Sequence, residues 1–127
     1  MRGCENTIIP DEVTRILEYA FSGCNGLDSI TIPKNINRVW EDAFEGCSGL
    51  SQIKVAPENK WFDSRNECNA IIVTATNSLV VGCKNTIIPN TVTDIAKSAF
   101  YNNQEIRYIK IPESVESVGY NSFYGCI

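Results

Sequence analysis

The 127-residue chain contains no histidine. Histidine is the commonest general base, the commonest zinc-binding partner of cysteine and a member of the usual catalytic triads, so those arrangements are excluded. The C-x-x-C, G-x-x-x-x-G-K, G-x-G-x-x-G and calcium-loop patterns are also missing. Paired carboxylates remain open as a catalytic device, but no pattern points to them. We therefore expect a protein that is not an enzyme, with no catalytic residue, cofactor or metal ligand.

Clusters of lysine and arginine are lacking too, and so are long hydrophobic runs. The net charge is −4, which argues against nucleic acid as a partner because phosphate binding needs a cationic face. The longest apolar runs, such as residues 70–73, are far too short to cross a bilayer. Repeat sequence begins almost directly after Met1, and no signal peptide precedes it. We expect neither nucleic-acid binding nor membrane insertion.

A repeated pattern accounts for most of the chain. Residues 27–47 read L-x-x-I-x-I-P-x-x-I-x-x-V-x-x-x-A-F-x-G-C. Most of these positions recur in the preceding repeat, with Phe21 in the place of Phe44, and in the last two repeats, although Asn102 and Asn103 replace the Gly-Cys in one of them. The phrase GCENTIIP at residues 3–10 returns as GCKNTIIP at residues 82–89. That separation exceeds three regular periods, so the third repeat contains an insertion of about ten residues.

The extra residues are predicted to form a β-hairpin near residues 68–83. Two β-branched runs, residues 69–73 and 78–82, flank a polar turn at residues 74–77. With Val73 opposite Ser78, one apolar face results because strand side chains alternate. That predicted face consists of three opposed pairs: Ile72 with Leu79, Ala70 with Val81, and Cys68 with Cys83.

Each regular repeat has a predicted shape. A short strand at residues 30–32 ends at Pro33, a second extended stretch carries Ile36 and Val39, and a single helical turn around Ala43 and Phe44 follows. No repeat can bury its apolar face alone, so the units must stack into a solenoid with one continuous core. We expect one domain, residues 1–127, of about five repeats: 4–26, 27–49, 50–82 with the hairpin, 83–105 and 106–127.

The pattern I-x-I-P-x-x-V-x-x-I-x-x-x-A-F-x-G-C resembles the BspA-like leucine-rich repeats of bacterial surface proteins, and the resemblance covers the chain from Cys4 to Cys126. It implies an α/β fold: a right-handed, strand-rich leucine-rich-repeat solenoid, or horseshoe, with short helical turns. It also implies a cell-surface or secreted adhesin-type module that binds a host matrix protein or a bacterial surface protein. The family has no shared catalytic residues. A structural spacer that displays another domain and a carbohydrate-binding module remain alternatives.

Outward-pointing strand positions are the candidate partner contacts. They are expected to align on the concave face, where solenoids commonly bind, although a merely solvated face is the alternative. Ile8 and Ile87 fall at the Thr31 position, so either the hairpin alters the register or the face has an apolar patch. The candidate positions are Ser29, Thr31, Gln52, Lys54, Tyr108 and Lys110.

Two tryptophans are further contact candidates. Trp40 directly follows Val39, and Trp61 directly precedes Phe62, the equivalent of Val39 in the third repeat. We expect both to project near one edge of the solenoid. Tryptophan is enriched at binding hot spots, but partial packing over the neighbouring turns is the competing interpretation.

The cysteines divide into two groups of interest. Cys24, Cys47 and Cys126 end the helical turns and are expected to form a ladder of buried thiols, with occasional bridging between adjacent positions. Cys68 and Cys83 face each other in the predicted hairpin. Opposed residues there have Cβ atoms about 4.5–5.5 Å apart, close to the distance of about 3.5–4.5 Å that a disulfide needs. A disulfide and two buried thiols both remain possible at this pair.

The opening phrase of the chain resembles the end of the repeat that contains the hairpin. A regular repeat has more residues between its cysteine and the following proline, as from Cys24 to Pro33, than the opening phrase has. The opening phrase has the same shorter spacing as Cys83 to Pro89. The opening phrase is therefore predicted to be the end of another hairpin repeat, in a slice of a longer array. Uncapped ends of such an array are expected to favour end-to-end self-association.

Overall fold

The computed structural model describes residues 8–101, 103 and 105–126. In this part of the chain short strands predominate, and one 3₁₀ helix accompanies them. In chain order the elements are β1 (Arg15–Ile16), β2 (Ser29–Ile32), β3 (Arg38–Val39), β4 (Gln52–Val55), β5 (Phe62–Asp63), η1 (Arg65–Glu67), β6 (Ile71–Val73), β7 (Ser78–Val81), β8 (Asp94–Ile95) and β9 (Ser117–Val118). No helix in the described residues has the length and apolarity needed to cross a membrane.

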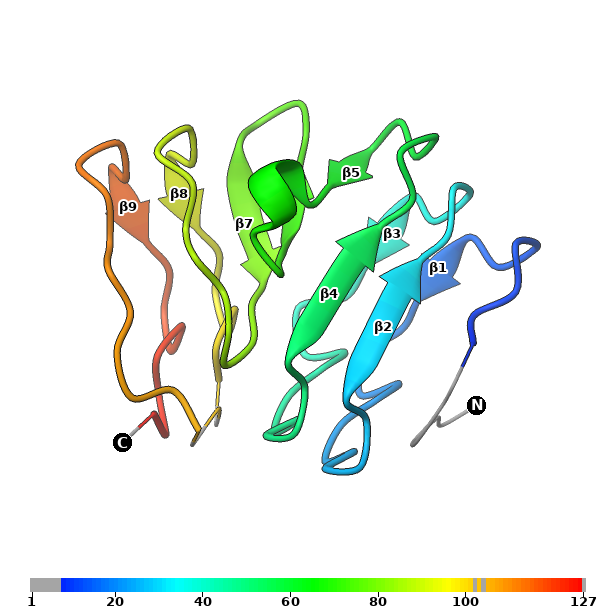
Figure 1. Ribbon diagram of the computed structural model, residues 1–127, viewed down its shortest axis with the longest axis horizontal. Helices are drawn as coiled ribbons and strands as arrows, with labels where there is room; N and C mark the ends of the chain where they lie inside the picture. The colour runs from blue at the N-terminus through cyan, green and yellow to red at the C-terminus, as the bar shows by residue number, and fades with distance from the viewer. Residues whose placement is uncertain (1–7, 102, 104, 127) are drawn as a thin grey trace.

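Successive repeats stack with their strands parallel. β2 pairs with β4, with Ser29 opposite Gln52, and β1 pairs with β3, with Arg15 opposite Arg38. Farther along, Asp94 of β8 lies opposite Ser117 of β9. In every one of these pairs the partners stand one sequence repeat apart, so the period of the sequence is the period of the stack. Figure 1 shows the strands following one another along the long axis of the molecule, from the N-terminal repeats on the right to the C-terminal repeats on the left.

The predicted helical turns are wrong. At Ala43 and Phe44 the chain forms consecutive tight turns, in which the N–H of Ala43 donates to the oxygen of Trp40 at 3.1 Å. A helix would need its N–H groups for its own carbonyls four residues back. Here the N–H of Phe21 instead donates to the oxygen of Ala43 in the next repeat, at 2.8 Å. The α/β expectation therefore gives way to a strand-rich fold with almost no helix.

Glycine closes these turns, which explains the recurring Gly-Cys. Gly23, Gly46 and Gly125 all have φ between +69° and +81°, a left-handed conformation that favours glycine. Beside the turns the phenylalanines of neighbouring repeats stack: Phe21 and Phe44 have ring centroids 5.0 Å apart. The turns are thus held by contacts between repeats, because each one is too short to be stable alone.

The predicted hairpin is present, but its register contains a bulge. β6 and β7 are antiparallel, with Val73 opposite Ser78 and Ile72 opposite Leu79 as expected. The register then shifts, and Ile71 lies opposite Val81, so the predicted pairing of Ala70 with Val81 is wrong by one residue. A bulge inserts an extra residue into one strand and turns the following side chains. Through β5–β6 and β7–β8 the hairpin becomes part of the line of short strands.

The core is divided by the hairpin. All six residues of the predicted apolar face are buried, but they do not share one face. Val81 and Cys83 pack with the N-terminal cluster, which contains Ile30 and Ile53, whereas Leu79 packs with the C-terminal cluster. The C-terminal cluster also contains Cys68, Ala70 and Ile72. The hairpin is therefore buried on both sides, between two groups of repeats.

Candidate functional site

The outward-pointing residues of β2 and β4 form one surface, which we call the β2–β4 patch: Ser29, Thr31, Gln52 and Lys54. All four are exposed, while the intervening Ile30 and Ile53 are buried. Ser29 lies opposite Gln52 and Thr31 opposite Lys54. The alternation arises because apolar side chains on one face of each strand enter the core.

A hollow of about 560 Å³ borders this patch. Ser29 and Thr31 line it together with Ile8 and Asp11. Ile8 is 85% exposed, so an apolar side chain does interrupt the polar strip at this end.

Residues 64–69, which contain η1, separate this patch from the C-terminal repeats; we call them the wedge segment. Its side chains bond to β4: the N–H of Val55 donates to Ser64 Oγ at 3.0 Å, and that of Ile53 donates to Asn69 Oδ1 at 3.4 Å. On its other side the N–H of Ile87 donates to the oxygen of Cys68 at 3.1 Å. Figure 1 shows the coiled turn of this segment between β5 and β7. The predicted strip is therefore divided in two.

Beyond the wedge lies a second surface, the Ile87–Tyr108 patch, comprising Asn66, Ile87, Asn90, Tyr108 and Lys110. These residues line a hollow of about 500 Å³. Ile87 is 78% exposed and Tyr108 82% exposed. Tyr108 and Lys110 are exposed as predicted, but the expectation that they lie on a strand is wrong, because residues 106–112 form no strand. Their neighbours are the wedge and Ile87. The hollow is also lined by Ile88, Pro89, Ile109 and Pro112, so two large, exposed side chains stand on a largely apolar surface with polar residues beside it. Such a composition is typical of a contact surface.

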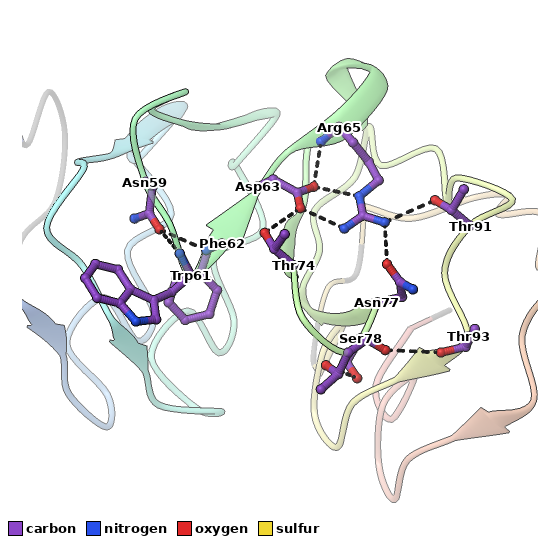
Figure 2. A network of polar contacts seen from close by, with 11 residues as sticks. Asn59, Trp61, Phe62, Asp63, Arg65, Thr74, Asn77, Ser78, Thr91 and Thr93 are labelled. Atoms are coloured by element: carbon purple, nitrogen blue, oxygen red, sulfur yellow. Dashed lines mark hydrogen bonds and ion pairs between the residues drawn. The ribbon is translucent and has the colours of Figure 1, made fainter.

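A polar network fixes the wedge segment (Figure 2). Arg65 makes a bidentate ion pair with Asp63, its Nε and Nη2 donating to the two carboxylate oxygens at 2.7 Å each. Arg65 Nη1 donates to Asn77 Oδ1 at 2.7 Å and to Thr91 Oγ1 at 3.3 Å. Thr74 Oγ1 donates to Asp63 Oδ2 at 2.7 Å. The network joins β5, the wedge, the hairpin turn and the next repeat, so it positions Asn66 at the wall of the second hollow.

The charge state of this network follows from its contacts. Burial raises the pKa of the Asp63 carboxyl, but the hydrogen bonds from Arg65 and Thr74 outweigh it and leave that pKa below its ordinary value. The Asp63 carboxylate in turn raises the pKa of the Arg65 guanidinium. Both groups are therefore fully charged at neutral pH.

The backbone of the wedge explains why the sequence did not reveal it. Asn66, Glu67 and Asn69 have positive φ values of 59°, 52° and 57°. Asparagine tolerates this conformation better than most residues. Two asparagines within the short stretch N-E-C-N were the available signal.

Asn59 is a second residue that the sequence did not single out. Its side-chain nitrogen donates to the oxygens of Pro33 and Ile36, and its side-chain oxygen accepts from the N–H groups of Trp61 and Phe62, at 2.8–2.9 Å. All four hydrogen bonds available to a carboxamide are made. Asn59 therefore holds β5 against the proline corner of the preceding repeat. Figure 2 shows its bonds to Trp61 and Phe62.

The two tryptophans differ in exposure. Trp61 is 45% exposed and lines a hollow between β3 and the hairpin. Trp40 is half-buried, and the Arg38 guanidinium lies over its ring, 4.2 Å from the centroid. Partial packing, the competing interpretation, describes Trp40, whereas Trp61 presents an exposed ring.

The cysteine ladder is present in part. Cys47 Sγ donates to the oxygen of Phe21 at 2.9 Å, and Cys126 Sγ to that of Phe100 at 3.2 Å, so each thiol bonds to the preceding repeat. Both are free, and burial raises the pKa of the Cys47 thiol to about 11. Cys24, by contrast, is disulfide-bonded.

Cys68 and Cys83 are buried free thiols in the structure, not a disulfide. The bulge accounts for this, because it moves Cys83 to Asn69, whose oxygen accepts from the Cys83 thiol at 3.3 Å. Burial also raises the pKa of Cys68, to about 11. Among the described residues no group of cysteines and carboxylates is arranged to hold a metal ion.

The repeats match a known family model. The family model described as a BspA type leucine rich repeat region, in six copies, matches residues 2–127. No match is found among the curated proteins. The match covers both patches, the wedge and the hairpin.

Solved bacterial proteins share the arrangement. A leucine-rich repeat protein from Eubacterium ventriosum ATCC 27560 superposes with a TM-score of 0.81 at 22% identity, covering 96% of this chain and 33% of that one. A leucine rich cell surface protein from Faecalibacterium prausnitzii A2-165 has a TM-score of 0.72 at 30% identity, covering 92% and 32%. The chain therefore spans about a third of the length of these proteins.

Proposed function

The chain belongs to the BspA-type leucine-rich repeat family, as its sequence pattern indicated, and we propose that it is a non-enzymatic module that binds another protein at the surface of a bacterial cell. A relative of 30% identity is described as a cell surface protein, which supports this location. The partner we propose is a host matrix protein or a protein of another bacterial surface. We also propose that the stack is a right-handed horseshoe, with both patches on its concave side.

The Ile87–Tyr108 patch carries the proposal. Binding hot spots are large side chains surrounded by contacts that contribute little energy themselves but exclude water when the partner docks. Ile87 and Tyr108 have this position, with Asn66, Asn90 and Lys110 around them. The wedge is held by the Asp63–Arg65 network, so the patch is formed before a partner arrives, and little ordering is needed on binding.

A matched pair of variants tests this role. Tyr108→Ser combined with Ile87→Ser removes the two exposed side chains of the patch. The control, Tyr120→Ser combined with Leu17→Ser, removes two other exposed apolar side chains. We expect the wild type to bind members of an array of purified matrix proteins, and the patch variant to bind at least about 30-fold more weakly, the effect of a hot-spot loss of about 2 kcal/mol. Equal weakening by the control variant contradicts the assignment.

The spacer alternative makes a different prediction. A spacer acts only through its length, so replacing this chain with unrelated repeats of equal length on the bacterial cell leaves cell adhesion intact. The binding proposal predicts that adhesion is lost. Carbohydrate binding through Trp40 and Trp61 has less support, because Arg38 covers the Trp40 ring.

A further inference from the structure

A third surface lies where two sheets end. β3 is an end strand of the two-stranded β1–β3 sheet, and β5 is an end strand of the five-stranded sheet. A hollow of about 310 Å³ is bordered by residues of both strands and of the hairpin, among them Val39, Phe62 and Val80. Strand edges of this kind are sites at which an extended peptide adds.

The hollow is lined by positively charged residues, whereas the chain as a whole has a negative net charge. Arg38 and Lys60 line it, and no acidic residue does so among the described residues. Arg15 lies opposite Arg38 in β1 and extends the positive charge. The chain as a whole has 15 acidic and 11 basic residues, so this concentration is not a consequence of composition. The one acidic residue of β5, Asp63, is neutralised by Arg65.

Hydrophobic side chains complete the surface. Val39, Phe62, Val73 and Val80 line the hollow, and the exposed ring of Trp61 stands at its border. Figure 2 shows the Trp61 and Phe62 side chains beside Asn59, which bonds to the N–H groups of both residues. Asn59 is also bonded to the preceding repeat, so the backbone that carries the Trp61 side chain is fixed in place.

We propose that this hollow binds an extended, acidic segment of a partner protein that also carries apolar side chains. The acidic groups pair with Arg38 and Lys60, and the apolar groups contact Trp61 and the valines. Such complementarity chiefly sets specificity and association rate. The surface is separate from the Ile87–Tyr108 patch, so it adds a second contact to the proposed binding module and does not depend on that patch.

Selection from a phage-displayed library of random peptides tests the proposal. The wild type is panned beside the variant Arg38→Gln/Lys60→Gln and beside Tyr108→Ser, which alters only the other patch. Arg38 and Lys60 are exposed, so the double variant is expected to keep the near-ultraviolet circular dichroism of the wild type. We expect acidic, apolar sequences to be enriched on the wild type and on Tyr108→Ser, and not on the double variant.

Titration of a selected peptide gives the second measurement. Trp61 fluorescence is followed in the Trp40→Phe background, where it is the remaining tryptophan. Removing both charges should weaken binding on the order of tenfold, Arg38→Lys should retain it, and added salt should reduce it. No acidic enrichment, or equal enrichment on the double variant, overturns the proposal. Equal binding of a heparin oligosaccharide identifies a general polyanion site and also overturns it.

Discussion

Asn59 offers the sharpest test of how the repeats are held together, because the repeat pattern and the structure predict opposite outcomes. Asn59 occupies the position that Ile36, a fully buried apolar residue, has in the preceding repeat. From the repeat alone, Asn59→Ile restores the regular pattern and should stabilise the fold. Burying an isoleucine side chain contributes about 1.5–3 kcal/mol.

The structure predicts destabilisation instead. Asn59 is buried and makes four hydrogen bonds, to Pro33, Ile36, Trp61 and Phe62. Each contributes about 1 kcal/mol net, and its loss leaves a backbone group in the interior without its partner. The loss of about 4 kcal/mol exceeds the apolar gain of about 2 kcal/mol. We expect Asn59→Ile to lower the free energy of unfolding by about 2 kcal/mol.

Equilibrium urea unfolding measures this value by linear extrapolation. Asn35→Ile is the matched control, because Asn35 is exposed and its side chain donates one hydrogen bond, to the oxygen of Asp11. We expect that variant to lose less than about 1 kcal/mol. If Asn59→Ile is as stable as the wild type or more stable, the reasoning is refuted.

Three further predictions concern the charged network, the thiols and the tryptophans. The folded-state pKa of Asp63 lies below the unfolded value of about 3.9, so its carboxylate stabilises the fold above about pH 4 and this contribution is lost as the pH falls through the folded-state pKa. At pH 7 the free energy of unfolding of the wild type should exceed that of Asp63→Asn by up to about 1 kcal/mol, and this difference should shrink as the pH falls below about 4. Urea unfolding across this pH range measures it, and a difference that stays constant contradicts the reasoning. Because burial raises the pKa of Cys47 and Cys68 to about 11, iodoacetamide at pH 8 should label them rapidly only in guanidinium chloride; rapid native labelling by mass spectrometry contradicts it. Acrylamide should quench the fluorescence of Trp61, measured in the variant Trp40→Phe, more strongly than that of Trp40, measured in Trp61→Phe. Equal quenching in the two variants contradicts the difference in exposure.

The stacked strands were predictable because they depend on local pattern. Isoleucines at alternate positions before a proline predicted β2, and the period of the repeat predicted which strands pair. The same pattern at residues 109–112 forms no strand, so the expectation of a strand in every repeat is wrong there. The hairpin was likewise predictable from its two β-branched runs around a polar turn. In each case the side chains that carry the signal lie within a few residues of one another.

The remaining features depend on contacts that span repeats. The turn at Ala43 is not helical because the oxygen of Ala43 accepts from Phe21 of the preceding repeat, and no local propensity expresses that bond. The bulge near Val80 and the left-handed backbone of Asn66 change which surfaces meet. They place Cys83 beside Asn69 and separate Tyr108 from Gln52, so the predicted single strip became two patches.

The central claim is that the Ile87–Tyr108 patch contacts a protein partner. Hydroxyl-radical footprinting of the wild type, with and without a purified matrix protein that it binds on the array, measures this directly at Tyr108. Tyr120, which is 74% exposed against 82% for Tyr108, serves as the internal reference. The account predicts that oxidation of Tyr108 falls on binding while that of Tyr120 is unchanged. Unchanged oxidation of Tyr108 in the bound protein would contradict it.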